Sequence, residues 1–575
     1  MNYTRLIALL TLLLCSTANA SMTFSVAGVG KQETENVMAY LAAGAYQLSA
    51  GVSEARVQRL ALRIEKDVRA ALEPFGYYTP VISTDFQPDG ENWRVGVSVN
   101  PGAPTLWQKL DIQVLGAGSP EKEFQDILAD LPMHTGQRAL HSQYERTKTS
   151  LRRAAADLGY LDAEFEYSEI LVDPGSHTAD VRLVLQTTDR FLFGPLIIEQ
   201  DVINDELLAR YVNIQEGDPF STARLLIAKQ TLYATDFFST VDLQADREDA
   251  VDGVVPVYIT AEKGKRHRYG LGFGYGTDTG YRVSGSWTLR RLNRAGHSLA
   301  VDARYSPIKW NFNSAYIIPI GNPALERLVL NAGTVDEDLG DANSHRVYGG
   351  GTVVRVPGDW QRETTMIYID ETSTLGPDNT RHDQYWVPSV GIMRKWSDTM
   401  IGVLGGFQIL GQVQASSTSL GLETSYVQAT LLAKTVIPVS SRSRVLLRGQ
   451  VGTTWVDNFD LLPASRRFFT GGDDSIRGYA YKSISPLSPD GLALGGKHLL
   501  VGSAEYAHTI SGPWGVAVFS DAGNAFNSSA DSLETSVGVG LRWRSPVGMI
   551  RIDVAKSISD SDRAPRLHIS VGPDI

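Results

Sequence analysis

The C-terminal half of the chain alternates apolar and polar residues with a period of two, and its charges gather on one face. Val539, Leu541 and Trp543 share one face. Arg542 and Arg544 lie on the other. Successive side chains of a β-strand point to opposite faces, so such a strand has one apolar and one charged face. A charged face is excluded from lipid but is normal in the lumen of a membrane barrel. The alternation therefore predicts a transmembrane β-barrel.

The alternation extends from about residue 266 to the C-terminus. Tyr269–Gly276 alternates large apolar residues with glycine, and its strict period of two with no following helix favours a strand over a phosphate-binding loop. Spanning strands take about 9–11 residues plus their turns, so residues 264–575 would form about 16 antiparallel strands. About 14 or 18 strands would also fit.

Composition is consistent with a membrane barrel outside the cytoplasm. The net charge is −11, which argues against nucleic-acid binding through a basic surface. Residues 1–20 resemble a secretory signal peptide, with an apolar centre at Leu6–Leu14 and a cleavage site at Ala18–Ala20. The only cysteine, Cys15, lies inside this segment. Lipidation at Cys15 is the alternative, but a large leucine precedes it.

The N-terminal half repeats a unit of about 80 residues, a period typical of domain arrays. Each unit reads as strand, helix, helix, strand, strand, and an aromatic turn opens its second strand. These turns are Phe75–Tyr78, Leu158–Leu161 and Asp236–Phe238. The repeat predicts three small α+β domains. Their predicted boundaries are 22–105, 106–188 and 189–263.

A glycine-broken segment near residue 470 is too irregular for a helix or a strand. Gly471 and Gly472 permit backbone angles that other residues avoid. Arg477 stands between Ile476 and Gly478, where it is suited to a charge-assisted pair with a carboxylate. A solvated loop with ordinary surface charges is the alternative.

Strand parity suggests which carboxylates Arg477 meets. If Ser520 faces lipid, then Phe519, Asp521 and Gly523 face the lumen. The same reasoning turns Glu505 of the preceding strand inward. If the loop entered the barrel, Arg477 could meet Asp521; Glu505 would be a second partner or an ordinary lumen charge.

Two motifs resemble the signature of the outer-membrane insertase superfamily of BamA and TamA type. One is the tetrad Ile476-Arg477-Gly478-Tyr479, and the other is Phe519-Ser520-Asp521-Ala522-Gly523. The longer sequence that extends through Tyr481–Ile484 is most similar to the TamA family. The resemblance implies that the loop folds back into the barrel and that the repeats are periplasmic POTRA domains.

The resemblance also implies a function in the outer membrane. It implies insertion and assembly of autotransporters and other β-barrel clients, captured unfolded by the POTRA domains, and an inner-membrane-anchored TamB-type partner. No metal-ligand spacing, nucleophile elbow or cofactor motif is present, so we expect no enzyme and no cofactor. A polypeptide exporter of the two-partner secretion type is the alternative, although such exporters usually have two POTRA units. A passive porin would lack the repeats and the loop motif.

Client handling suggests two further hypotheses. Open edges of the POTRA sheets would bind extended client strands through the main chain, unless the repeats are only spacers. The barrel seam would open sideways, because both of its strands are weak by composition. The seam residues are Gly270, Gly272, Gly274 and Gly276 on the first strand, and Ile569 and Val571 on the last, before Pro573. Glycines that merely relieve crowding are the alternative.

Overall fold

The computed structural model describes most of the chain. The described residues are 22–572, apart from 45, 47–53, 90–91, 278, 377–378, 400–402, 529–530, 546–547 and 561. The predicted signal peptide with Cys15, and also Pro573, lie outside the described residues. No helix in the described part is long and apolar enough to cross a membrane.

Each N-terminal repeat is a three-stranded sheet with two helices, in the predicted order. The first consists of β1 (Met22–Ala27), α1 (Lys31–Ala43), α2 (Glu54–Leu72), β2 (Val81–Asp89) and β3 (Asn92–Asn100). The second consists of β4 (Leu106–Gly116), α3 (Lys122–Ala129), α4 (His141–Asp157), β5 (Glu164–Asp173) and β6 (Thr178–Thr187). The third consists of β7 (Leu192–Glu199), α5 (Asp205–Val212), α6 (Thr222–Ala234), β8 (Phe238–Gln244) and β9 (Val254–Lys263).

The last strand of each repeat lies at the centre of its sheet, in the orders β1-β3-β2, β4-β6-β5 and β7-β9-β8. In the first repeat, β3 pairs in parallel with β1 and antiparallel with β2. The core forms where Ile64 and Val68, one helical turn apart on α2, join Val95 and Val97, which alternate on β3. Burying each such side chain contributes about 1.5–3 kcal/mol. The second repeat has a separate apolar core, which includes Leu151 of α4 and Leu183 of β6.

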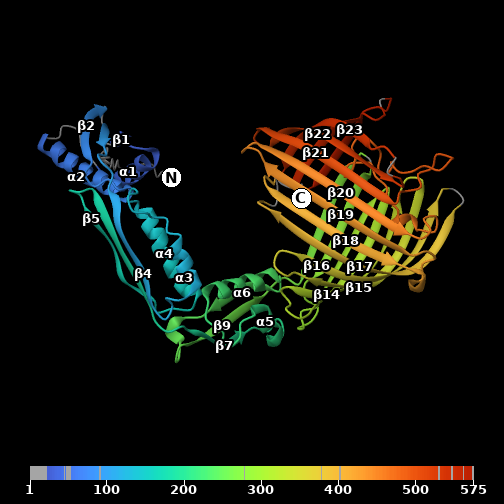
Figure 1. The fold of residues 1–575 in the computed structure, drawn as a ribbon, viewed down its shortest axis with the longest axis horizontal. Coiled ribbons are helices and arrows are strands. Elements are labelled where there is room, and N and C mark those ends of the chain that lie inside the picture. Colours follow the sequence, from blue (N-terminus) through green and yellow to red (C-terminus); the bar gives the residue numbers. More distant parts are fainter. Residues whose placement is uncertain are drawn as a thin grey trace, which may run out of the picture. The chain divides into compact units, whose positions relative to one another are not determined.

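The C-terminal part is one antiparallel sheet of 16 strands joined in chain order, β10 to β25, as the alternation predicted (Figure 1). Its first eight strands are β10 (His267–Gly276), β11 (Gly280–Leu289), β12 (Ser298–Ser306), β13 (Lys309–Pro319), β14 (Glu326–Asp338), β15 (Ala342–Arg355), β16 (Gln361–Leu375) and β17 (Thr380–Ser397). The others are β18 (Gly406–Ser416), β19 (Tyr426–Pro438), β20 (Ser443–Val456), β21 (His498–Ser511), β22 (Trp514–Phe526), β23 (Glu534–Ser545), β24 (Gly548–Ser557) and β25 (Arg566–Gly572). Short 3-10 turns are η1 (Glu73–Phe75), η2 (Arg247–Asp249), η3 (Thr418–Leu420) and η4 (Ala464–Arg466).

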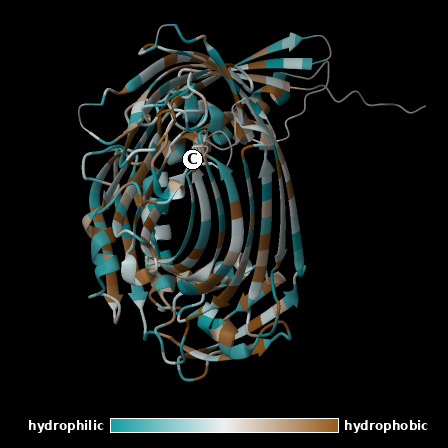
Figure 2. Ribbon diagram, turned by 90° about the vertical axis from the view of Figure 1, so that its right-hand side faces the viewer, coloured by the Kyte–Doolittle hydropathy of each residue, from teal (hydrophilic) through white to brown (hydrophobic). Residues whose placement is uncertain are grey.

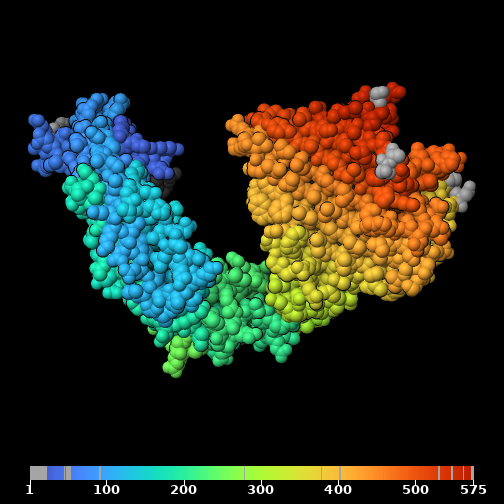
Figure 3. Space-filling model, viewed as in Figure 1, coloured from blue at the N-terminus to red at the C-terminus, as the bar shows by residue number. Residues whose placement is uncertain are grey.

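The two faces of this sheet differ as a membrane barrel requires. On β23, Val539 is 60% exposed whereas Arg542 is 4% exposed, so the apolar residue faces outward and the charge faces the lumen. Apolar and polar residues alternate along the barrel strands in Figure 2. The strands coloured yellow to red form a continuous wall on the side seen in Figure 3.

The barrel is nearly closed. Among the described residues, β10 and β25 stand at opposite ends of the hydrogen-bonded strand order and share no ladder pairing with each other. The outward side chains of β10 are highly exposed, with Leu271 83% and Phe273 79% exposed. An apolar strand with one unpaired edge therefore borders the seam.

Candidate functional site

The glycine-broken segment belongs to a long connection, residues 457–497, between β20 and β21. We call it the luminal loop. Ile476 and Tyr479 are buried in one apolar cluster with Leu499 and Val501 of β21 and Ala525 of β22. Leu499 and Val501 alternate with outward Leu500 and so face the interior of the barrel. The loop is therefore folded inside the barrel, and the solvated-loop alternative is wrong.

Arg477 lies where parity expected it, against two inward carboxylates. Its Nε and Nη2 atoms donate to the two oxygens of Asp521 at 2.8 and 2.9 Å. Its Nη1 atom donates to Oε2 of Glu505 at 2.9 Å. Asp521 is fully buried, so this two-pronged contact matches the planar fork of arginine to a carboxylate that has no water around it.

Two further charges complete the cluster, and the sequence interpretation did not assign them to it. Nη1 of Arg477 also donates to Oδ2 of Asp553 at 3.1 Å. Arg542 donates from Nε to Oε1 of Glu505 at 2.9 Å and binds Asp553 as well. Parity had placed Arg542 on the charged face of its strand. The same reasoning turns Asp553 inward between the outward Ile552 and Val554, and that was the available signal. We call these two arginines and three acids the charge cage.

An aromatic ring forms one side of the cage. The guanidinium carbon of Arg477 lies 3.3 Å from the ring centroid of Phe519, a distance typical of a cation–π contact. A Cβ atom on Gly538 of β23 would lie 2.2 Å from the same ring, so glycine there makes room for Phe519. Gly523 is equally constrained, since its Cβ would lie 2.4 Å from the carbonyl oxygen of Leu500.

The motif glycines adopt conformations that side chains rarely reach. Gly471, Gly472 and Gly478 have φ angles of 109°, 98° and 95°, in the region that favours glycine. A Cβ on Gly471 would also lie 2.5 Å from the carbonyl oxygen of Ala480. These residues turn the backbone so that Arg477 points to its partners and Tyr479 enters the apolar cluster.

The loop has a second attachment point, at η4, which the sequence interpretation missed. Arg466 donates from Nη1 to Oε1 of Gln414 at 3.0 Å and from Nε to the hydroxyl of Tyr385 at 3.3 Å. The hydroxyls of Tyr385 and Ser465 donate to Glu371 of β16 at 2.9 and 2.7 Å. The start of the motif is thus fixed to β16, β17 and β18.

A third attachment follows the motif. Lys482 donates from Nζ to Oε1 of Glu337 on β14 at 2.8 Å, and the hydroxyl of Tyr481 donates to the same oxygen at 3.2 Å. Lys309 of β13 and Arg346 of β15 also pair with Glu337. The loop therefore binds the wall at three separated places and is held as one unit.

The predicted seam residues of β10 face the lumen, whereas those of β25 face lipid. Because Leu271 and Phe273 point outward, Gly270, Gly272, Gly274 and Gly276 face the lumen. On β25 His568 is buried inside, so Ile569 and Val571 fall on the lipid side of the wall. The structure therefore does not bring these two sets of residues together face to face.

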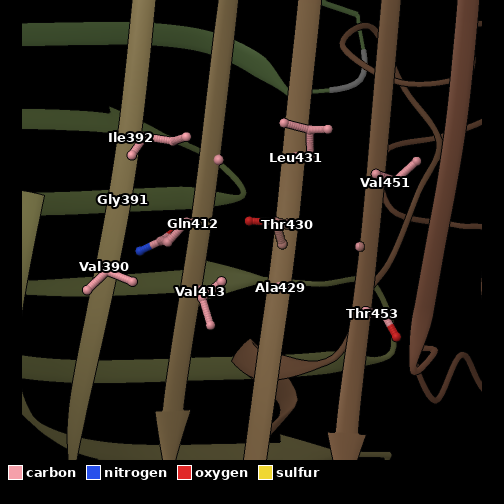
Figure 4. A pocket seen from close by; sticks show the side chains of 12 residues that line it. Val390, Gly391, Ile392, Gln412, Val413, Ala429, Thr430, Leu431, Val451 and Thr453 are labelled. Carbon is pink, nitrogen blue, oxygen red and sulfur yellow. The ribbon is translucent and has the colours of Figure 1, made fainter. Parts of the chain in front are cut away.

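A hollow of about 450 Å³ lies across β17 to β20. Figure 4 shows side chains from four neighbouring strands around it, among them Val390, Val413 and Leu431. These three side chains are exposed on the outer wall, and none of the lining residues is charged. The hollow is a lipid-facing surface. The described residues contain no group of three His, Cys, Asp or Glu that could hold a metal ion.

Comparison with family models identifies the barrel. The model described as the Omp85 superfamily domain matches residues 263–574, more than half of the chain. The chain belongs to the Omp85 superfamily. A POTRA model described as TamA domain 1 matches residues 23–101, and a surface antigen variable number repeat, a POTRA model, matches residues 192–264. Superfamily membership and the barrel indicate an outer-membrane protein whose POTRA domains lie in the periplasm.

Two curated relatives are outer membrane protein assembly factors named BamA. The one from Nitratidesulfovibrio vulgaris is 25% identical over 421 residues, covering 69% of this chain and 52% of the relative. The one from Neisseria meningitidis serogroup B is 21% identical over 572 residues, covering 86% of this chain and 70% of the relative. The chain thus spans about half the length of the first relative.

A solved structure shares the fold. BamA from Haemophilus ducreyi lacking POTRA domains 1–3 matches with a TM-score of 0.65 and 19% identity, covering 81% of this chain and 99% of that chain. At this identity the likeness concerns the fold alone.

Proposed function

We propose that this Omp85 protein is the outer-membrane subunit of a translocation and assembly module of TamA type. It would insert autotransporters and other β-barrel proteins, and it would work without catalytic chemistry or a cofactor. The observation that carries the assembly function is the seam, where β10 and β25 share no ladder in the described part of the chain. The match of residues 23–101 to the first POTRA domain of TamA supports the narrower assignment.

Client capture would begin at the sheets of the POTRA domains. In the first domain, β1 and β2 are the outer strands of the sheet, and an outer strand presents unpaired N–H and C=O groups. An unfolded client segment can add to such an edge through its main chain, with little dependence on its sequence. The client would then pair with the exposed strand edge at the seam.

The partner provides the test of the TamA-type assignment. A TamB-type protein, anchored in the inner membrane and reaching across the periplasm, would bind the POTRA domains. Crosslinking in intact envelopes, followed by capture of the barrel and mass spectrometry, should recover such a protein together with unfolded autotransporters. Recovery of other partners only would contradict the TamA-type assignment. Recovery of a dedicated secreted substrate instead of barrel clients would favour the exporter alternative.

Deleting residues 22–105 should leave a folded barrel that assembles clients poorly. The first POTRA domain has its own apolar core, centred on residues such as Val95 and Val97, so the barrel is not expected to depend on it. Surface display of an autotransporter, measured by protease accessibility, should fall while barrel abundance stays unchanged. Normal display would support the spacer function instead.

The full chain should fractionate with the outer membrane and migrate faster on gels when it is not heated. A barrel of 16 strands linked by ladder hydrogen bonds resists mild detergent, because opening it exposes many unpaired backbone groups at once. Recovery in the soluble periplasmic fraction would contradict the localisation.

A further inference from the structure

One carboxylate of the luminal loop, Asp473, lies against the last strand of the barrel. Its Oδ1 atom is 2.6 Å from Nδ1 of His568 on β25, and the backbone N–H of Gly478 donates to Nε2 of the same ring at 2.9 Å. Because Nε2 accepts that hydrogen bond, the ring proton is on Nδ1 and is donated to Asp473. His568 is 2% exposed, so two hydrogen bonds from the loop hold β25 from inside.

The other oxygen of the same carboxylate lies beside the first two strands. Oδ2 of Asp473 is 3.9 Å from Nη2 of Arg282 on β11, and Arg282 donates from Nε to Oγ1 of Thr279 at 2.8 Å. A Cβ atom on Gly276, the last residue of β10, would lie 3.1 Å from Oδ2. Asp473 therefore contacts both sides of the seam.

The glycines of β10 differ in what a side chain would meet. Cβ atoms on Gly270 and Gly272 would meet the hydroxyls of Ser286 and Ser284 on β11, and these can rotate away. Of the inward glycines on β10, only Gly276 has a loop atom among the contacts of its Cβ position. A Cβ atom at position 276 would also lie 2.7 Å from Oγ1 of Thr279 and 2.9 Å from Nη2 of Arg282, so glycine here leaves room for the side chains that receive Asp473.

We infer that Asp473 and His568 bridge the barrel seam from the lumen and hold it shut. The described residues of β10 and β25 lack ladder pairing, so contacts through the loop replace backbone hydrogen bonds between them. Asp473 and His568 are positioning residues, because they act on the seam strands rather than on a client. The inference rests on the proposed lateral opening and specifies which contacts must break for it.

The charge cage gives the bridge its fixed end. Arg477 binds Glu505, Asp521 and Asp553, which lie on β21, β22 and β24. Asp473 precedes Arg477 by four residues in the loop and contacts His568 of β25 and Arg282 of β11. Opening therefore separates Asp473 from one side of the seam while the cage stays closed, and the loop does not have to leave the barrel.

Distance measurement between two spin labels tests the bridge without any client. Cysteines at Val283 of β11 and Ile552 of β24 place labels on outward, partly exposed positions on either side of the seam. Cys15 is replaced by serine so that only these positions react. With the native loop we expect one narrow distance distribution. Asp473→Ala or His568→Ala should broaden it and move it outward by about one strand spacing, ~5 Å.

Matched variants separate the bridge from general damage. Asp474→Ala removes the next carboxylate of the loop but leaves the hydrogen bond between Asp473 and His568 in place, so the distribution should match the parent. Gly276→Ala should open the seam, whereas Gly272→Ala should not. The double variant of Asp473 and His568 should open it no further than either single variant. If the alanine variant does not fold, Asp473→Asn tests the β11 side of the bridge alone, because the amide oxygen still accepts from His568 but the charge that pairs with Arg282 is gone.

The result that overturns the bridge is a parent-like distribution in Asp473→Ala and His568→Ala, or an equal shift in Asp474→Ala. That result would leave the proposed assembly function standing, because no client takes part in the measurement. A failure of client assembly with an intact bridge would argue against the function and not against the bridge.

Discussion

Replacing Arg477 with alanine should lower both the folded yield of the barrel and its client assembly. The substitution leaves Glu505, Asp521 and Asp553 buried around a single remaining cage arginine, Arg542. Removing one partner of a buried ion pair costs about 3–5 kcal/mol, because the other charge stays buried without compensation. We expect a loss of that order in the free energy of unfolding, measured by denaturant titration of the heat-modifiable form.

Two comparison variants make this result specific. Arg477→Lys should rescue only partly, because an ammonium lacks the planar fork that reaches both oxygens of Asp521. Arg381→Ala removes an inward arginine that pairs with Asp383 and Glu423 on the wall. Asp383 is buried whereas Glu423 is exposed, so one buried acid instead of three loses a partner. The loss should therefore be smaller, and assembly should continue. Equal activity of Arg477→Ala and the parent, at equal abundance, would show that the cage has no part in assembly.

Strand parity explains why so much of the site could be predicted from sequence. A side-chain period of two fixes which residues face the lumen once a single outward residue is known. Glu505, Phe519 and Asp521 were assigned to the interior in this way, and the structure buries all three. The strand count followed from length, since a barrel strand must span a membrane of nearly fixed thickness.

Parity does not determine which inward charges meet. Asp553 and Arg542 both lie on the luminal face, but their contact with Arg477 depends on the stagger of neighbouring strands and on the path of the loop. Lys482 and Glu337 are 145 residues apart, and no local pattern links them. The last strand was interpreted only from its apolar face, which does not include His568. Its contact with the luminal loop could therefore not be predicted from the sequence.

A disulfide across the seam should abolish client assembly, and reductant should restore it. One cysteine is placed among residues 270–276 of β10 and one among residues 566–571 of β25, and pairs are scanned for oxidation. Only pairs whose Cα atoms come within about 7 Å can be bridged, so the scan itself reports how closely the two strands approach. Since only Cys15 is native and can be replaced, each crosslink is assigned without ambiguity.

The control for the crosslink is a disulfide where the barrel is already closed. Phe273 and Val283 stand directly opposite each other in the β10–β11 ladder, so a bond between cysteines there adds no restraint on the seam. That variant should assemble clients normally under oxidising conditions. If the seam variant is oxidised to completion and still assembles clients at the rate of the control, the wall does not open.

Clients must then pass through the lumen, which requires the luminal loop to release Glu337 and Glu371 together with the charge cage. A lateral route requires only Asp473 to release its partners. Because the lateral route keeps the buried ion pairs of the loop intact, we expect the barrel to open at the seam.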